Sequence, residues 1–328
     1  MRNYYRAVFR WTSRWLYLGL HLHKTVAKNP KFWFRSRSHR LGTTTLVVLF
    51  SFSLVGTLPF PLAQAETYRQ LPNASAPAKS GYWIVSFNGS VIGFGLPELP
   101  YRCSGAGSLD PGGNYVIGGY ALANHEGYWG INNLGVVTGF GSANCEGDMY
   151  SLGSNFVLNA SAVGIAATPD ARGYWITAAD GGVFAFGDAS FFGSMGSRPL
   201  TVPIVGMASS PDGQGYWEVA SDGGIFAFGD ANFYGSMGSK PLNAPIVGMA
   251  STSDGKGYWE VASDGGVFGF GDAPFEGAAV GNTGDLPVVA MARTIDDNGY
   301  WLLASDGTSL NLGDAFCPPA AATAGKCI

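Results

Sequence analysis

Short apolar runs separated by glycine-rich turns recur along the chain from residue 81 to residue 316. In the clearest unit of this pattern, we predict three strands, at Pro203–Ala208, Tyr216–Ser221 and Ile225–Phe228. The turn Asp222-Gly223-Gly224 joins the last two runs, and Asp-Gly supplies the positive φ angles that tight hairpin turns need. We therefore expect a small antiparallel sheet in each unit, with a fourth strand around Phe233–Ser236.

The pattern repeats six times, each time around the tripeptide Gly-Tyr-Trp. The copies begin at Gly81, Gly127, Gly173, Gly215, Gly257 and Gly299, at spacings of 46, 46, 42, 42 and 42 residues. Because the runs are apolar on both faces, one unit alone cannot bury them, whereas copies stacked in a ring can. The sequence predicts an all-β fold, a β-propeller of six blades with a period near 42 residues. Seven blades closed by the terminal segments, and a β-solenoid, are the alternatives.

The repeats also define the domain organisation. The propeller domain spans residues 81–316, and residues 317–328 form a C-terminal tail. Residues 66–80 form an N-terminal segment that we expect to help close the ring, with Thr67–Leu71 as an outer strand of the last blade. Such closure would remove exposed sheet edges.

The first 65 residues predict an export signal. They hold ten basic and no acidic residues, then the uncharged apolar run Leu46–Leu58, then Ala63-x-Ala65. A basic n-region, a short apolar stretch and a small-residue exit are the parts of a secretory signal peptide, cleaved here before Glu66. An uncleaved membrane anchor over Thr43–Leu62 is the alternative, because that stretch reaches the length of a span.

Charge changes sharply beyond this leader. Residues 66–328 contain the remaining 9 of the 19 basic residues and all 23 acidic residues, so they carry a net charge of −14. That charge argues against nucleic-acid binding, which depends on neutralising phosphates. Charged residues make up only 13% of the whole chain against 14% aromatic residues and 49 glycines, a composition that favours strands and tight turns over amphipathic helices.

The repeat itself reads Gly-Tyr-Trp-x-Val-Ala-Ser-Asp-Gly-Gly-Ile/Val-Phe-x-Phe-Gly-Asp-Ala-x-Phe-x-Gly-Ser, most clearly in the copies at Gly173, Gly215 and Gly257. It resembles the repeats of secreted actinobacterial proteins. The resemblance implies a propeller-like fold and an extracytoplasmic location, and it brings no catalytic site. The spacing in Thr168-x-Asp170…Trp175 is also similar to the Asp-box of sialidase-type propellers, which is a structural turn, and we carry no sialidase activity over.

Two carboxylates are the best candidates for catalysis. Three positions after the repeat glycine, two adjacent copies carry Glu218 and Glu260. Paired carboxylates can serve as the acid and the nucleophile of a glycosidase if their separation is suitable. The alternative is that both side chains face solvent or bond a neighbouring turn.

Aspartates recur at two further repeat positions. One row is Asp180, Asp222, Asp264 and Asp306, and the other is Asp188, Asp230, Asp272 and Asp314. Short-range hydrogen bonds in turns explain both rows. Calcium is the alternative ligand, since loop carboxylates bind it, but the chain has no Asp-x-Asp-x-Asp-Gly loop. We therefore expect no other cofactor or metal.

The recurrent Tyr-Trp pairs have two interpretations. A tryptophan at a fixed strand position in every copy favours a role in the core between blades. Aromatic faces also stack on sugars and anchor protein partners. In that case Tyr174, Tyr216 and Tyr258 are the residues that we expect to be exposed for ligand binding.

The chain contains four cysteines, an even number that suits disulfide pairing in an exported protein. Cys145 and Cys317 lie eighteen residues after their repeat glycine, where the regular copies carry Phe191, Phe233 and Phe275. Cys103 falls at the same place once four extra residues are allowed for. We favour the pairs Cys103–Cys145 and Cys317–Cys327, with Cys103–Cys327 as the rival.

These observations favour a secreted or cell-envelope repeat protein that acts as a non-catalytic binding or scaffold module. Its partner would be a protein or a cell-wall glycan, and it would meet a membrane only if the leader is uncleaved. An extracellular polysaccharide-acting enzyme of glycoside-hydrolase type is the alternative function.

Overall fold

The chain divides into two compact units, Met1–Pro59 and Phe60–Ile328. The computed structural model describes residues 68–70, 82–86, 91–94, 99–104, 116–121, 126–153, 156–281, 286–323, 325 and 327, all in the second unit. The predicted signal peptide, residues 1–65, therefore lies outside the described residues. No helix within the described ranges is long and apolar enough to cross a membrane.

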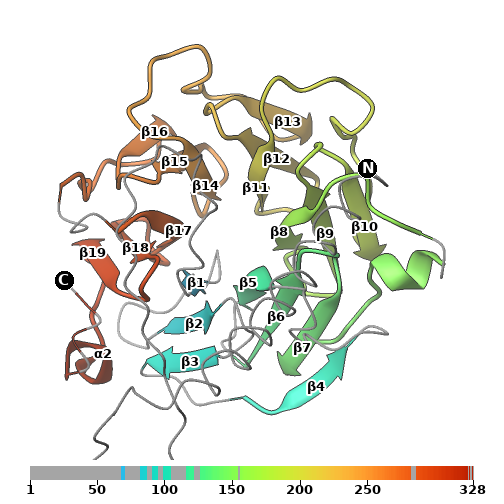
Figure 1. Ribbon diagram of the computed structural model, residues 1–328, viewed down its shortest axis with the longest axis horizontal. Helices are drawn as coiled ribbons and strands as arrows, with labels where there is room; N and C mark the ends of the chain where they lie inside the picture. The colour runs from blue at the N-terminus through green and yellow to red at the C-terminus, as the bar shows by residue number, and fades with distance from the viewer. Residues whose placement is uncertain are drawn as a thin grey trace, which may run out of the picture. The chain divides into compact units, whose positions relative to one another are not determined.

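The described part of the chain consists of small antiparallel sheets in repeated units (Figure 1). The strands are β1 Tyr68–Gln70, β2 Tyr82–Ser86, β3 Val91–Phe94, β4 Tyr101–Ser104, β5 Val116–Ala121, β6 Gly127–Asn132, β7 Val137–Gly141, β8 Ala162–Ala167, β9 Gly173–Ala178, β10 Val183–Gly187, β11 Ile204–Ser209, β12 Gly215–Ala220, β13 Ile225–Gly229, β14 Ile246–Ser251, β15 Gly257–Ala262, β16 Val267–Gly271, β17 Val288–Arg293, β18 Gly299–Ala304 and β19 Ser309–Gly313. A 3₁₀ turn, η1, covers Met149–Leu152, and a short helix, α2, covers Pro319–Thr323. The all-β expectation is therefore confirmed, with one five-residue α-helix in the tail.

Each copy of the repeat forms its own sheet. The first strand precedes the repeat glycine, the second contains Gly-Tyr-Trp, and the third follows the hairpin turn, so the sheets run β11-β12-β13, β14-β15-β16 and so on. In the sheet β11-β12-β13, Trp217 lies opposite Ala208 on one side and Ala227 on the other. The three strands expected in each copy are thus present.

The hairpin turns are held by their first aspartate. Gly224 N–H donates to Asp222 Oδ1 over 2.9 Å. Gly223 has a φ angle of 78°, which glycine adopts without the steric strain that a residue with a side chain would meet. The equivalent aspartates Asp180, Asp264 and Asp306 accept the same bond. This row of aspartates is confirmed as part of the turns.

The prediction of a fourth strand around Phe233–Ser236 is wrong, because this segment forms no strand. In this segment Tyr234 N–H donates to the Tyr258 hydroxyl over 3.1 Å, and the same hydroxyl donates to Gly235 O over 2.5 Å. The segment therefore bonds to a side chain of the next sheet. Gly235 also has a φ angle of 127°, which breaks an extended strand.

The first strands of neighbouring sheets contact one another in the order β5, β8, β11, β14 and β17 (Figure 1). They enclose a narrow cavity of about 50 Å³, lined by apolar residues such as Val205, Val247 and Val289. The strand β1 contacts both β5 and β17, so it closes the succession of sheets.

The predicted place of the closing strand is nevertheless wrong. The segment Thr67–Leu71 was expected at the outer edge of the last copy, but β1 pairs antiparallel with β2, with Arg69 opposite Val85. It is therefore the first strand of the first copy's own sheet. The three strands β17, β18 and β19 of the last copy come from one continuous stretch and need no strand from the N-terminus.

Aromatic rings fill the space between successive sheets. The tryptophan of one sheet packs against the tyrosine of the next, with ring centroids 5.5 Å apart for Trp175–Tyr216 and 5.7 Å apart for Trp217–Tyr258. The repeat tryptophans whose burial the structure describes are all buried, from Trp129 to Trp301. Trp217 Nε1 donates to Asn232 O over 2.7 Å, so its one polar atom is satisfied. The core role of the tryptophans is confirmed.

Candidate functional site

The three candidate ligand-binding tyrosines are buried between sheets. Tyr174, Tyr216 and Tyr258 have no exposed surface. The hydroxyl of Tyr216 donates to Gly193 O over 2.5 Å and accepts from Phe192 N–H over 3.2 Å, and Tyr174 makes the same pair of bonds to Gly147 O and Glu146 N. Burial raises the pKa of Tyr216 and of Tyr258 to about 12, so both stay protonated donors. Their expected exposure is wrong, because strands with two apolar faces pack against a sheet on each side.

The candidate catalytic carboxylates are fully buried as well. Glu218 Oε1 accepts a hydrogen bond of 2.5 Å from the Thr177 hydroxyl in β9 of the preceding sheet. Glu260 Oε1 accepts from Met237 N–H over 3.4 Å, in the segment that follows β13. The second oxygen, Oε2, of each carboxyl group has no partner. Burial is the main cause that raises the pKa of Glu218 to about 7 and that of Glu260 to about 8.

These contacts put the two glutamates in different places. Glu218 lies between its own sheet and that of β9, whereas Glu260 lies between its own sheet and that of β13. The sheet β11-β12-β13 therefore stands between the two junctions. A glycosidase needs two carboxylates that face one substrate bond, and this arrangement offers no such shared face. Of the two non-catalytic alternatives, bonding to a neighbouring segment is correct for Glu260, and exposure to solvent is wrong for both.

The second row of aspartates closes a recurrent turn. In the copy at Gly173, the Thr168 hydroxyl donates to Asp170 Oδ1 over 2.9 Å and lies 3.1 Å from Asp188 Oδ1. Gly173 N–H donates to the same hydroxyl oxygen over 3.0 Å. These hydrogen bonds hold the turn together, so its aspartates have a structural role, as in the Asp-box that the sequence resembles.

Two carboxylates meet in each of these turns, and in the copy at Gly215 each of the two shifts the pKa of the other. Burial and the neighbouring Asp212 raise the pKa of Asp230, whereas hydrogen bonds from Gln214 N–H and the Ser210 hydroxyl lower the pKa of Asp212. Bonds from Lys256 lower the pKa of Asp254 to about 2. Across the described ranges, no group of three or more His, Cys, Asp or Glu side chains is placed to hold a metal ion.

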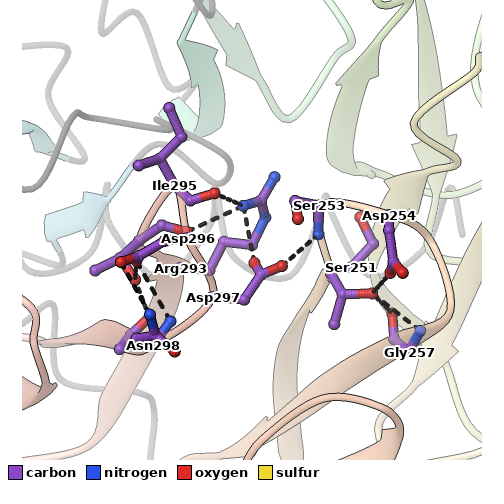
Figure 2. Close-up of polar contacts among 12 residues, drawn as sticks. Ser251, Ser253, Asp254, Gly257, Arg293, Ile295, Asp296, Asp297 and Asn298 are labelled. Carbon is purple, nitrogen blue, oxygen red and sulfur yellow. Dashed lines mark hydrogen bonds and ion pairs between the residues drawn. The ribbon is translucent and has the colours of Figure 1, made fainter.

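The turn of the copy at Gly299 carries a polar link that the described turns of the copies at Gly173, Gly215 and Gly257 lack. Figure 2 shows Asp297 between Arg293 and Ser253. Asp297 Oδ1 accepts from Arg293 Nη1 over 2.9 Å, and Oδ2 accepts from Ser253 N–H over 2.8 Å in the preceding turn (Figure 2). The ion pair is largely shielded, since the two side chains are 14% and 15% exposed. It joins the turns of two successive copies.

The turns of the copies at Gly215 and Gly257 fill this place with a glycine that faces a proline of the preceding turn. A Cβ atom built on Gly213 would lie 2.7 Å from Pro169 Cδ, and one on Gly255 would lie 2.6 Å from Pro211 Cδ. Where Ser253 replaces the proline, its N–H becomes a donor and there is room for the side chain of Asp297. This pair was not predicted from the sequence, although the repeats show the joint change of Pro211 to Ser253 and of Gly255 to Asp297.

The structure forms both of the favoured disulfides. Cys103 bonds Cys145 and Cys317 bonds Cys327, each with Cα atoms 6.0 Å apart. Cys103 lies in β4, which pairs with the outer edge of β7, opposite Gly139. Cys327, in the predicted tail, forms an isolated parallel bridge with Ser309 of β19.

Phenylalanines occupy the equivalent position in the three regular copies. Phe191, Phe233 and Phe275 are 59%, 60% and 63% exposed, although each belongs to a copy with a fully buried Tyr-Trp pair. A phenylalanine that recurs at one repeat position predicts a packing residue, and for these three side chains that prediction is wrong. They are the largest regularly spaced apolar side chains on the surface of the described residues.

No protein-family model matches the chain, and no curated protein matches it significantly. The fold and the contacts above therefore define its class, a repeat protein of small antiparallel sheets joined by aromatic packing and stabilised by two disulfides.

Proposed function

We propose that this chain is an extracytoplasmic six-bladed β-propeller that acts as a non-catalytic binding or scaffold module for a protein or a cell-wall glycan. One sheet for each of six copies, with β1 in contact with both β5 and β17, supports the six-bladed ring. The leader pattern and two disulfides support export, because disulfides persist in oxidising compartments.

One contrast carries the proposal for function. The candidate catalytic carboxylates and the tyrosines are used in contacts between sheets, whereas the three equivalent phenylalanines remain exposed. Exposed aromatic side chains at regular positions are typical of surfaces that bind partners. The buried polar residues thus build the fold, whereas the phenylalanine that the three regular copies share leaves an apolar surface exposed.

A screen against cell-wall polysaccharides and envelope proteins tests the proposal. The mature protein should be retained on at least one of these materials and should release no sugar fragments. Replacing all three phenylalanines by alanine should remove the retention without changing the circular dichroism spectrum. Cleavage of a polysaccharide that is lost in Glu218→Gln or Glu260→Gln would instead support the enzyme.

Export has its own test. N-terminal sequencing of protein recovered outside the cell should read from Glu66. A chain that stays in the membrane fraction with Leu46–Leu58 still present would establish the anchor and contradict secretion.

A further inference from the structure

Two sheets have an outer strand that is covered by another segment of the chain. The strand β4 pairs with the outer edge of β7, and Cys327 forms a bridge to Ser309 in β19. In both cases a disulfide ties the covering segment to the cysteine that lies eighteen residues after the repeat glycine, Cys145 or Cys317. A side chain at this repeat position therefore points to the outer edge of its own sheet.

The three regular copies have the same position without the covering segment. The strands β10, β13 and β16 are each the last strand of their sheet and pair with no further strand among the described residues. The position that holds Cys145 in the second copy holds an exposed phenylalanine in each of them. Phe275 also lines a hollow of about 300 Å³ together with Val267 and Phe268 of β16. An open strand edge with an exposed apolar side chain beside it is an arrangement that binds extended peptides by strand addition.

The register shows which backbone groups are free along β13. Asp230 N–H donates to Gln214 O over 3.1 Å, and Ala220 N–H donates to Gly224 O over 2.8 Å. Hydrogen-bonded pairs alternate along an antiparallel ladder, so Ala227 and Gly229, which lie between these pairs, point their N–H and C=O groups away from β12.

The covered edge shows how such groups are used. The positions in β7 that match Ala227 and Gly229 are Gly139 and Gly141. Gly141 N–H donates to Pro100 O over 2.8 Å, just before β4, and Gly139 lies opposite Cys103. The open edge of β13 therefore offers the donors and acceptors that hold β4 on β7.

Side chains add selectivity at the covered edge. Arg102 Nε donates to Asn144 Oδ1 over 2.8 Å, and the Tyr101 ring packs edge-on against Phe140 with centroids 6.1 Å apart. Among the edges of β10, β13 and β16, that of β13 carries both residues, because Phe228 matches Phe140 and Asn232 follows β13 where Asn144 follows β7. The copies of β10 and β16 carry Ser190 and Pro274 there.

We propose that the outer edge of β13 binds an extended segment of a partner protein that carries an aromatic residue, an arginine and an apolar residue in succession. The segment pairs antiparallel with β13, its arginine bonds Asn232, and its apolar side chain covers Phe233. An arginine also suits the charge of residues 66–328, with 9 basic against 23 acidic residues. This inference rests on the proposed binding function and narrows it to a polypeptide partner.

Disulfide trapping with a synthetic peptide tests the proposal. The probe is Leu-Pro-Tyr-Arg-Cys-Ser, the sequence of residues 99–104, with its cysteine activated as a mixed disulfide with 2-thiopyridine and offered to the full chain that carries Phe233→Cys. The introduced thiolate attacks the peptide sulfur and releases 2-thiopyridone, so the exchange needs no further oxidant. The peptide cysteine should then take the place of Cys103, whose Cα lies 6.0 Å from that of Cys145. The matched control is Phe191→Cys, which keeps an open edge but has Ser190 in place of asparagine.

The proposal expects the mixed disulfide to form about tenfold faster with Phe233→Cys than with Phe191→Cys, the factor of one charge-assisted hydrogen bond. Alanine in place of the peptide arginine, or Asn232→Ala in the protein, should abolish this difference. Ala227→Pro should slow the trapping further, because it removes one of the N–H groups that face the edge.

Equal rates for the two cysteine variants, or for a scrambled peptide, would overturn the proposal. A disulfide-linked homodimer of Phe233→Cys that forms in preference to the peptide adduct would also overturn it, and would identify a second copy as the occupant. Retention on a polysaccharide without any peptide trapping would leave the binding function in place and remove only the strand partner.

Discussion

At the scale of single residues, the position three residues after the repeat glycine shows that burial decides what a carboxyl group does. The regular and last copies place Ile176, Glu218, Glu260 and Leu302 there, and all four side chains are fully buried. The fold therefore accepts an apolar side chain at this position. A glutamate is compatible with it mainly as the neutral acid, because desolvation penalises the charged form.

This burial predicts a stability that falls as the pH rises. The pKa of Glu218 is raised to about 7 and that of Glu260 to about 8 in the folded protein, from an ordinary value of 4.5. A raised pKa means that the folded state binds more protons, so the contribution is fully present below about pH 4.5 and is lost as the pH passes through about 7 and 8. Urea unfolding from pH 5 to pH 9 should show this decline.

The variant Glu218→Gln,Glu260→Gln should have a flatter profile. It should equal the wild type near pH 5 and exceed its free energy of unfolding at pH 9 by about 6 kcal/mol, the sum of the two shifts over this pH range. Glu146→Gln, at an exposed side chain, is the control and should keep the slope of the wild type. The same slope in all three proteins would show that the buried carboxyl groups are not the cause.

At the scale of single elements, the turns that begin with Thr or Ser contact the turn of the next copy through one of two kinds of residue pair. One pair is a proline facing a glycine, as Pro211 faces Gly255, and the other is Ser253 facing Asp297. Asp297 adopts a φ angle of 64°, which costs energy for a residue with a side chain. Its bonds to Arg293 Nη1 and Ser253 N–H compensate for that cost.

A double-mutant cycle tests this pairing. Ser253→Pro alone should destabilise the protein by about 2 kcal/mol or more, because it removes the donor to Asp297 and places the proline ring against its side chain. Ser253→Pro with Asp297→Gly should recover most of the loss, since it recreates the pair found at Pro211 and Gly255. Additive losses in thermal unfolding would contradict the pairing.

The covered edge of β7 supports a second prediction at this scale. Replacing Cys103 and Cys145 by serine should lower the free energy of unfolding by about 2–4 kcal/mol and release β4. Gly141 N–H, which donates to Pro100 O, should then exchange with deuterium as fast as Gly229 N–H at the open edge of β13. Continued protection of Gly141 would show that β4 holds its place without the disulfide.

Sequence alone predicted the elements better than their contacts. Turn residues such as Asp222-Gly223 defined the three strands of each sheet, because local hydrogen bonds and φ angles fix such turns. The burial of Tyr216 and Glu218 depends instead on which sheet packs beside them, and strands with two apolar faces do not encode that. The cysteine pairs were predictable because their number is even and three of the four occupy one repeat position, where the regular copies carry phenylalanine.

At the scale of the whole set of sheets, β1 connects the first copies of the repeat with the last copy. This strand pairs with β2 and also contacts β5 and β17, the first strands of the second and last copies. Contacts of this kind couple neighbouring repeats, so the stability of an array is shared between its copies. An array without β1 would lose both contacts at once.

Deleting residues 66–80 should therefore lower the melting temperature by about 5–10 °C relative to a chain that begins at Glu66. The deletion removes β1 and leaves the edge of β2 without its partner. Differential scanning calorimetry measures the change. An unchanged melting temperature would mean that β1 contributes nothing to closure.

The three regular sheets, from β8 to β16, are each built from one continuous stretch of chain, and this has a consequence for how the gene can change. Insertion or loss of 42 codons, the spacing of these copies, adds or removes a whole sheet and divides none. Each new copy would bring a tryptophan for the sheet after it and a tyrosine for the sheet before it, so unequal recombination between copies can change their number without breaking an aromatic junction.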